Sequence, residues 1–143
     1  MYRLTENWHL KFTAPDGSSY DIPARVPGNV IGDLVRSGIL PDPFYGTNSH
    51  LTYPWEKICW VYENPFRTPE TKANERVQLT LHGADTVFEL FINGKRVGDH
   101  VLDPVVSRFD KHVRYVVHDV SKHLKKGRNA IGVVLGTGWY NCH

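Results

Sequence analysis

Residues 87–97 read Val-Phe-Glu-Leu-Phe-Ile-Asn-Gly-Lys-Arg-Val, and they decide the fold. The run before Asn93 is almost continuously apolar, and residues 95–97 resume a strand-like pattern. Asn-Gly between two such runs is the strongest short-range hairpin signal, because a type I′ turn needs a positive φ at both central residues. We therefore predict two antiparallel strands joined at Asn93-Gly94.

Period-two alternation of apolar side chains, the spacing of a pleated strand, recurs elsewhere in the chain. Val77, Leu79 and Leu81 alternate with polar residues. Further strands are predicted at residues 8–12, 20–22, 58–66, 112–117 and 130–135. Short strands without strand–helix alternation favour an all-β antiparallel sandwich, and a jelly roll is the natural candidate. We expect residues 1–143 to form a single domain.

One short helix is predicted at residues 30–37, with Asn29 as its N-cap and Gly38 as its stop signal. Asp33 is expected on the polar side of this helix. Residues 40–54 contain three prolines and a glycine, so we predict an irregular stretch there. A short helical turn is expected at residues 120–124.

The composition is that of an ordered globular protein, with 143 residues, 41% hydrophobic and 22% charged. The formal charge of +2 and the basic run at residues 122–128 fit a solvated loop better than a phosphate-binding surface, so no nucleic-acid partner is expected. No run of 18 apolar residues and no apolar segment of a signal peptide occurs, so we expect no membrane association.

Cofactor and metal sites are not predicted. Cys59 and Cys142 match no metal or redox spacing, and whether they pair stays open. The closest histidines, His112, His118 and His123, lack the i,i+4 spacing of a helical zinc site. The phosphate-binding and serine-nucleophile motifs are also missing from the sequence.

Catalytic residues are likewise not predicted. A glycosidase needs two carboxyl groups at a defined separation, and none of the fifteen acidic residues stands out as half of such a pair. Turn or solvent roles suffice for most of them, including Asp16, Asp33, Asp42, Asp85 and Asp119.

Aromatic side chains are the more informative group, because flat rings stack on apolar surfaces such as the C–H faces of sugars. Trp60 and Tyr62 share one face of a predicted strand, and Trp139 and Tyr140 follow a glycine-rich turn. A Trp and a Tyr two residues apart on a strand are also typical of a sandwich core, and that alternative is kept for Trp60 and Tyr62.

Motifs in a fixed order resemble the N-terminal domain of glycoside hydrolase family 2 enzymes of the β-mannosidase- or β-galactosidase-like branch, with the β-mannosidase-like enzymes the more similar. The motifs are Arg25-Val26-Pro27-Gly28-Asn29-Val30, Asp33-Leu34, Gly38 to Asn48, Trp60-Val61-Tyr62 with Phe66, Leu81 to Thr86, Phe91 to Lys95 with Gly98, and Asp119-Val120-Ser121 with Leu124, Gly127 and Asn129. The ending Leu135-Gly136 with Gly138-Trp139-Tyr140 also resembles accessory sandwiches of α-L-rhamnosidases, so the sugar stays open.

This resemblance implies a jelly roll of galactose-binding-domain-like topology without the catalytic machinery. In such enzymes the catalytic glutamates lie on a separate TIM barrel of the same parent chain, so we expect this chain to be a piece of a larger multidomain glycosidase. Family enzymes of this kind are commonly secreted, periplasmic or lysosomal, and nothing in these residues distinguishes among these locations.

Two functions remain open at this stage. In the first, the domain packs beside the barrel and helps to wall a pocket for a terminal sugar, with carbohydrate as its partner. The candidate contacts are Asp42, Tyr45, Asn48, Trp60, Tyr62, Trp139 and Tyr140. In the second, the domain is a purely structural module that supports neighbouring domains and touches no sugar; a rigid, proline-pinned surface connection is the corresponding interpretation of residues 42–48.

Overall fold

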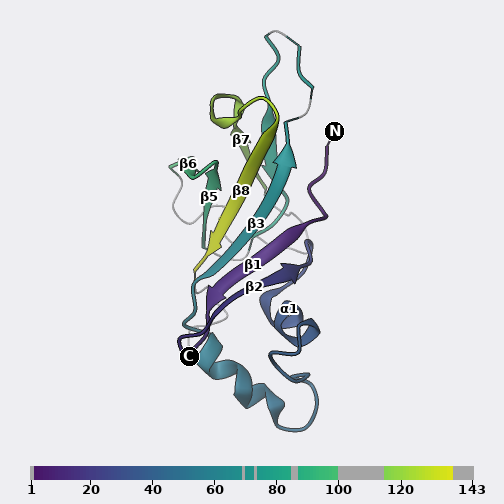
Figure 1. The fold of residues 1–143 in the computed structure, drawn as a ribbon, viewed down its shortest axis with the longest axis vertical. Helices are drawn as coiled ribbons and strands as arrows, with labels where there is room; N and C mark the ends of the chain where they lie inside the picture. The colour runs from purple at the N-terminus through teal and green to yellow at the C-terminus, as the bar shows by residue number, and fades with distance from the viewer. Residues whose placement is uncertain (1, 69, 73, 85–86, 100–114, 137–143) are drawn as a thin grey trace.

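The computed structural model describes residues 2–68, 70–72, 74–84, 87–99 and 115–136. Two short helices, α1 (Val30–Arg36) and the 3-10 helix η1 (Asn48–Trp55), lie at one end of the sheet, and the 3-10 turn η2 (Ser121–His123) lies at the opposite end (Figure 1). The strands are β1 (Trp8–Thr13), β2 (Ser19–Ala24), β3 (Trp60–Arg67), β4 (Gln78–Leu81), β5 (Phe88–Ile92), β6 (Lys95–Val97), β7 (Val116–Asp119) and β8 (Arg128–Leu135).

Each of these strands pairs with its neighbours in antiparallel orientation. Six form one sheet of order β2-β1-β3-β8-β5-β6, and β4 pairs with β7 in a two-stranded sheet. Residues of β7 face β5 and β6, since Val116 and His118 line the same small cavity as Leu90 and Val97. The prediction of a mostly antiparallel β domain is therefore confirmed.

The Asn-Gly hairpin forms as predicted between β5 and β6. Asn93 has φ 52° and Gly94 has φ 75°, the positive values that a type I′ turn requires. The register pairs Ile92 with Lys95 and Leu90 with Val97. Other predicted strands agree with the structure to within two residues at their ends, except the one predicted at residues 112–117. That strand is seen as Val116–Asp119, and residues 112–114 lie outside the described part.

The core is a row of apolar side chains that crosses the whole large sheet. Register places them side by side from one edge strand to the other, and each is at most 8% exposed: Ile22, Leu10, Tyr62, Val133, Leu90 and Val97. Burying such side chains contributes about 1.5–3 kcal/mol each. This row shows why period-two alternation in the sequence translates directly into a buried face.

Helix α1 begins where the sequence predicts. The Asn29 side chain accepts a hydrogen bond from the Gly32 amide at 2.7 Å, and Gly38 takes a φ of +70° after the last turn. Leu34 is fully buried. None of the helices in the described ranges is long and apolar enough to cross a membrane.

The prediction of an irregular stretch over residues 40–54 is wrong in its second half, where η1 forms. The prediction of one short helix therefore missed this second one. Its backbone bonds span three residues, as from the His50 amide to the Thr47 carbonyl, so Pro54 removes only one donor from a short element. Trp55 anchors the end of η1, because its indole lies parallel to that of Trp60 with centroids 6.3 Å apart.

Candidate functional site

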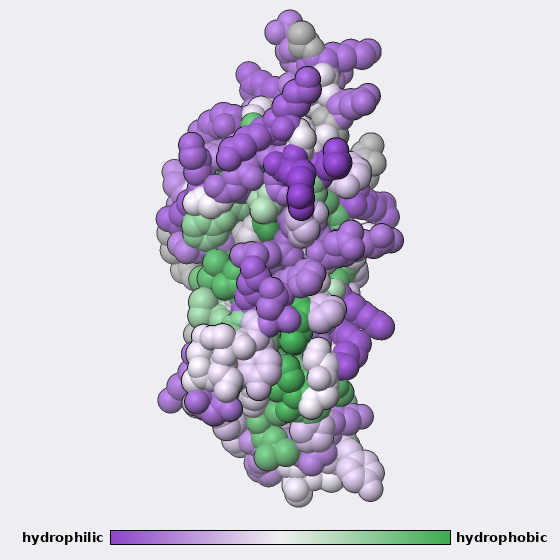
Figure 2. Space-filling view, viewed as in Figure 1, coloured by the Kyte–Doolittle hydropathy of each residue, from purple (hydrophilic) through white to green (hydrophobic). Residues whose placement is uncertain are grey.

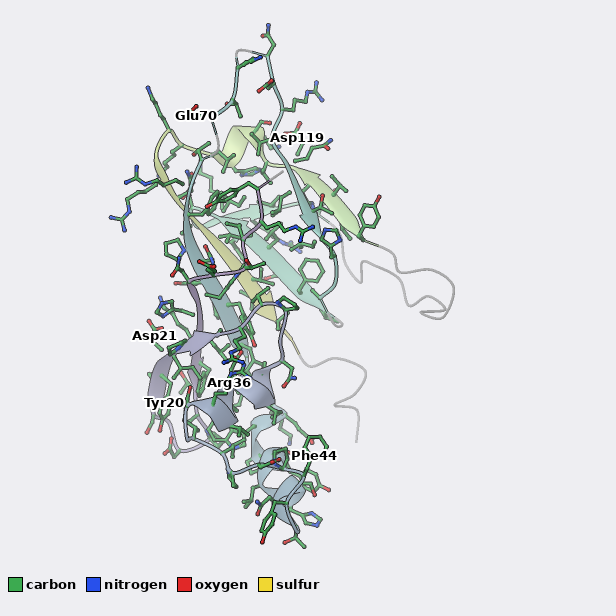
Figure 3. The ribbon with its side chains drawn as sticks, turned by 90° about the vertical axis from the view of Figure 1, so that its right-hand side faces the viewer. Tyr20, Asp21, Arg36, Phe44, Glu70 and Asp119 are labelled. Carbon is green, nitrogen blue, oxygen red and sulfur yellow. The ribbon has the colours of Figure 1, made fainter. Side chains whose placement is uncertain are left out.

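Residues 41–55, here called the aromatic loop, contain the sequence-predicted residues Asp42, Tyr45 and Asn48. The loop runs from the end of α1 through η1 at one end of the molecule, where Phe44 projects outward (Figure 3). Phe44 is 96% exposed and Tyr45 79%. Leu51 and Tyr53 are also at least half exposed. Large apolar side chains are thus concentrated on one short, outward-facing segment.

Internal hydrogen bonds fix the first half of the aromatic loop. Asp42 Oδ1 accepts from the Phe44 amide at 2.9 Å, and the Asp42 carbonyl accepts from Asn48 Nδ2 at 2.9 Å. The amide of Tyr45 donates to the same carbonyl at 3.2 Å, and the Asn48 amide donates to the Tyr45 carbonyl at 3.2 Å. Asp42, Tyr45 and Asn48 therefore lie together in one preformed turn.

The second half of the loop carries further rings that the sequence analysis did not select. His50 and Tyr53 make an edge-to-face pair with centroids 5.3 Å apart. Thr52 Oγ1 donates to the Ser49 carbonyl at 2.8 Å and holds the turn of η1. The available signal was composition, because residues 41–55 contain one formally charged side chain, Asp42, and four aromatic residues.

Trp60 and Tyr62 lie in the core rather than on an open surface. They are 6% and 7% exposed, respectively. The Trp60 ring packs on Phe12 with centroids 5.0 Å apart and on Trp55. These positions match the alternative in which the pair belongs to the sandwich core. Trp139 and Tyr140, the remaining candidates, lie outside the described residues, as does Cys142; Cys59 is an exposed free thiol.

Asp33 corrects the expectation of a solvent-facing carboxylate, because its side chain is fully buried. Its Oδ2 accepts from the Tyr62 hydroxyl at 2.9 Å, and its Oδ1 accepts from the Arg25 amide at 3.0 Å and from Arg36. Buried carboxylates persist when paired in this way. Burial, together with the neighbouring Asp33 charge, raises the pKa of Tyr62 far above its usual range and keeps its hydroxyl a donor.

The Asp33 cluster ties three segments together at the base of the aromatic loop. It connects α1 to β3 through Tyr62 and to the turn before α1 through Arg25. That turn is too tight for a side chain at Gly28, where an added Cβ would meet the Arg25 carbonyl oxygen at 2.3 Å. The helix that precedes the aromatic loop is therefore held rigidly by Asp33, and Trp55 anchors the last residue of the loop.

Two hollows on the described part of the molecule are lined by residues outside the aromatic loop. One is the small cavity between β5, β6 and β7. The other is a shallow depression on the outer face, lined among others by Lys11, Tyr20, Asp21 and Cys59. There Lys11 Nζ donates to Glu63 Oε2 at 2.6 Å, which raises the pKa of Lys11. Within the described ranges, no group of three His, Cys, Asp or Glu side chains is arranged to hold a metal ion.

Comparison with known proteins relates the chain to two kinds of glycosidase. The sequence model of the α-L-rhamnosidase N-terminal domain matches residues 75–143. β-Mannosidase of Rattus norvegicus is 31% identical over 132 residues, which are 91% of this chain and 14% of that protein. An α-L-rhamnosidase of Formosa agariphila is 51% identical over 53 residues, 37% of this chain and 6% of that protein.

A solved structure agrees with these sequence matches. The β-D-mannosidase of Dictyoglomus thermophilum superposes with a TM-score of 0.74 and 27% identity over 95% of this chain, which corresponds to 15% of that protein. The chain thus spans a small part of the length of each relative that it matches.

Proposed function

Because this chain has the N-terminal sugar-binding-like domain shared by family 2 β-mannosidases and by α-L-rhamnosidases, we propose that it is a non-catalytic domain of a larger exo-glycosidase. It packs beside a catalytic TIM barrel of the same protein and helps to wall a pocket for a terminal sugar. We further propose that β4 and β7 belong to the second sheet of a jelly roll, facing the six-stranded sheet.

The observation that carries this proposal is the preformed turn of the aromatic loop. Tyr45 is 79% exposed, and its hydroxyl can both donate to and accept from a sugar hydroxyl. Beside it, the second carboxylate oxygen of Asp42 and the amide oxygen of Asn48 are acceptors for sugar hydroxyls. Trp139 and Tyr140 remain proposed contacts from the end of the chain.

Trp60 and Tyr62 support this site from below rather than by touching the sugar. Trp60 holds Trp55, the last residue of the aromatic loop, and Tyr62 holds Asp33 at the start of α1. Their proposed role is therefore to position the loop, since both rings are occupied by packing within the domain.

The test is the activity of the complete gene product on nitrophenyl β-mannoside, α-rhamnoside, β-galactoside and β-glucoside. We expect hydrolysis of one of these glycosides, a raised KM in Tyr45→Ala and Asn48→Ala, and no change in Tyr2→Ala, which alters an exposed tyrosine outside the loop. Failure to release nitrophenol from a broad glycoside panel would remove the glycosidase assignment.

The alternative function is a structural module without sugar contact. It is favoured by the exposure of Phe44 and Leu51, since neither side chain offers a hydrogen bond to a sugar. The same variants separate the two functions: unchanged KM in Tyr45→Ala and Asn48→Ala, with full hydrolysis by the wild type, would support the structural role.

A further inference from the structure

We propose that the aromatic loop is a docking knob, in which Phe44, Tyr45, Leu51 and Tyr53 insert into an uncharged, concave apolar surface on another domain of the same protein. This inference rests on the proposed function for the existence of that domain. It assigns Phe44, Leu51, Tyr53 and the ring of Tyr45 to protein contact, whereas the Tyr45 hydroxyl and the polar atoms of Asp42 and Asn48 stay with the proposed sugar.

The shape of the surface is the first argument. Ligand pockets are concave and surround the molecule they bind. The aromatic loop lines neither of the two hollows on the described part of the molecule, and Phe44, which is 96% exposed, lies on the surface of the part of the molecule that carries the loop (Figure 3). A convex group of rings fits into a recess on a partner, as the aromatic anchors of protein interfaces do.

The charge of the loop is the second argument. Asp42 is the one formally charged residue among residues 41–55, and its Oδ1 is already bonded to the Phe44 amide. Burying an unpaired charge is costly, and interface cores are correspondingly depleted of charged residues. The composition of the loop suits permanent burial against an uncharged surface and does not suit an electrostatically guided encounter.

Rigidity is the third argument. The bonds around Asp42 and Asn48, the His50–Tyr53 ring pair and the Trp55 anchor hold the loop in one conformation before any partner arrives. A preformed surface loses less conformational entropy on docking than a flexible one. The exposed rings are therefore already ordered by hydrogen bonds and ring packing within the loop.

The size of the surface decides between a tethered domain and a second copy of the chain. A large aromatic side chain buries about 150–250 Å². Weighted by their exposure, the four side chains offer about 500 Å², or about 1,000 Å² counting both faces. That area lies within the about 600–1,500 Å² of interfaces between domains of one chain and below the about 1,200–2,000 Å² of stable complexes between separate proteins.

The phenol group of Tyr53 defines one edge of the recess. Buried tyrosine hydroxyls find hydrogen-bond partners, so the partner surface must present acceptors, such as backbone carbonyl groups, opposite Tyr53. The expected occupant is therefore an apolar recess with carbonyl groups at its edge.

Hydroxyl-radical footprinting of the complete gene product tests the proposal without any substitution. Each ring's labelling is normalised to its labelling in denaturant. We expect Phe44, Tyr45 and Tyr53 to be labelled several-fold less than Tyr2 and Tyr115, which are 61% and 60% exposed and serve as internal controls. Labelling of the loop rings at the level of these controls would overturn the proposal.

A double variant, Phe44→Ser with Tyr45→Ser, supplies the second measurement. In the complete gene product it should raise the labelling of Tyr53 several-fold, whereas Tyr115→Ser should leave Tyr53 unchanged. Protection that appears only on raising the protein concentration would identify a second copy, and protection that appears only with added sugar would identify a sugar surface; either result overturns the tethered-domain proposal. Protected rings in a product without glycosidase activity would instead refute the proposed function and leave this inference standing.

Discussion

The two ends of the large sheet expose side chains of opposite character. At one end the aromatic loop leaves apolar rings uncovered, whereas residues 67–76 and 119–128, here called the polar end, contain ten Asp, Glu, Lys and Arg side chains among twenty residues. Figure 2 displays this contrast, with hydrophilic residues dominating the upper part of the view and paler and green residues gathered lower down. The polar end is suited to water, and the aromatic end to a partner.

Asn129 joins the segments of the polar end by hydrogen bonds within the domain. It is 5% exposed, and its Oδ1 accepts from the Lys125 amide and from Asn93 Nδ2, both at 2.8 Å. Its Nδ2 donates to Thr68 Oγ1 at 2.6 Å and to the Lys125 carbonyl at 2.9 Å. One amide thus joins the hairpin, the turn after η2 and the end of β3. The segments of the polar end are therefore bonded to one another. We expect substitutions at the two ends to change the stability of the domain by different amounts.

The largest effect is expected at the buried base of the aromatic end. Asp33→Ala should lower the free energy of unfolding by about 3 kcal/mol, because Tyr62 and the Arg25 amide lose their acceptor inside the protein. Chemical denaturation measures this change. Phe44→Ser at the same end is the control, with an expected change below about 0.5 kcal/mol in this chain, since its ring touches water. Equal losses of stability in the two variants would contradict the conclusion that Asp33 stabilises the domain and that the exposed Phe44 ring does not.

At the polar end, Asn129→Ala should lower the free energy of unfolding by about 2 kcal/mol, because the Lys125 amide loses its acceptor and Thr68 Oγ1 loses a donor in a part-buried cluster. The exposed neighbour change Lys126→Ala should cost almost nothing. Hydrogen exchange of the Lys125 amide provides a local readout, and it should accelerate only in the Asn129 variant. An Asn129→Ala protein of wild-type stability would mean that the polar end is not closed by this residue.

Gly94→Ala should cost about 1 kcal/mol, because a residue with a Cβ is strained at a φ of 75°. Gly132→Ala is the matched change on β8, where an added Cβ meets only Phe91 Cβ at 3.8 Å. Thermal unfolding of the two variants compares them directly. Similar losses in both would show that the hairpin turn is not the constraint that the sequence suggested.

The smallest effect concerns pH at the polar end. Hydrogen bonds from Ser121 hold the pKa of Asp119 below its usual value, so its contribution is present at neutral pH and is lost as the pH falls below about 4. Asp119→Asn should therefore flatten the loss of stability in acid slightly, as measured by denaturation at a series of pH values. An unchanged acid profile would contradict this assignment.

The sequence analysis correctly predicted features that depend on neighbouring residues. The Asn93-Gly94 hairpin and the Asn29 cap follow from residues a few positions apart, and both formed as expected. The hydrogen bonds that bring Asp42 and Asn48 into one turn are equally local, but they were not predicted, because residues 40–54 were expected to be irregular.

Contacts between distant residues could not be predicted in this way. Asp33 is buried because Tyr62, 29 residues later, donates to it, and helical spacing near Asp33 carries no sign of that partner. The end of η1 is held by the packing of Trp55 on Phe12 of β1, with ring centroids 5.9 Å apart, which no local propensity describes. Trp60 and Tyr62 suited either a core or a sugar-facing strand by alternation, and only the tertiary structure places them inward.

The parallel indoles of Trp55 and Trp60 give the molecule an optical signature. Their planes differ by 13° at a centroid separation of 6.3 Å, so their transition dipoles are coupled and the near-ultraviolet circular dichroism depends on this arrangement. Because one indole ends the aromatic loop and the other begins β3, a change in that spectrum reports movement of the loop relative to the sheet, without any label being attached.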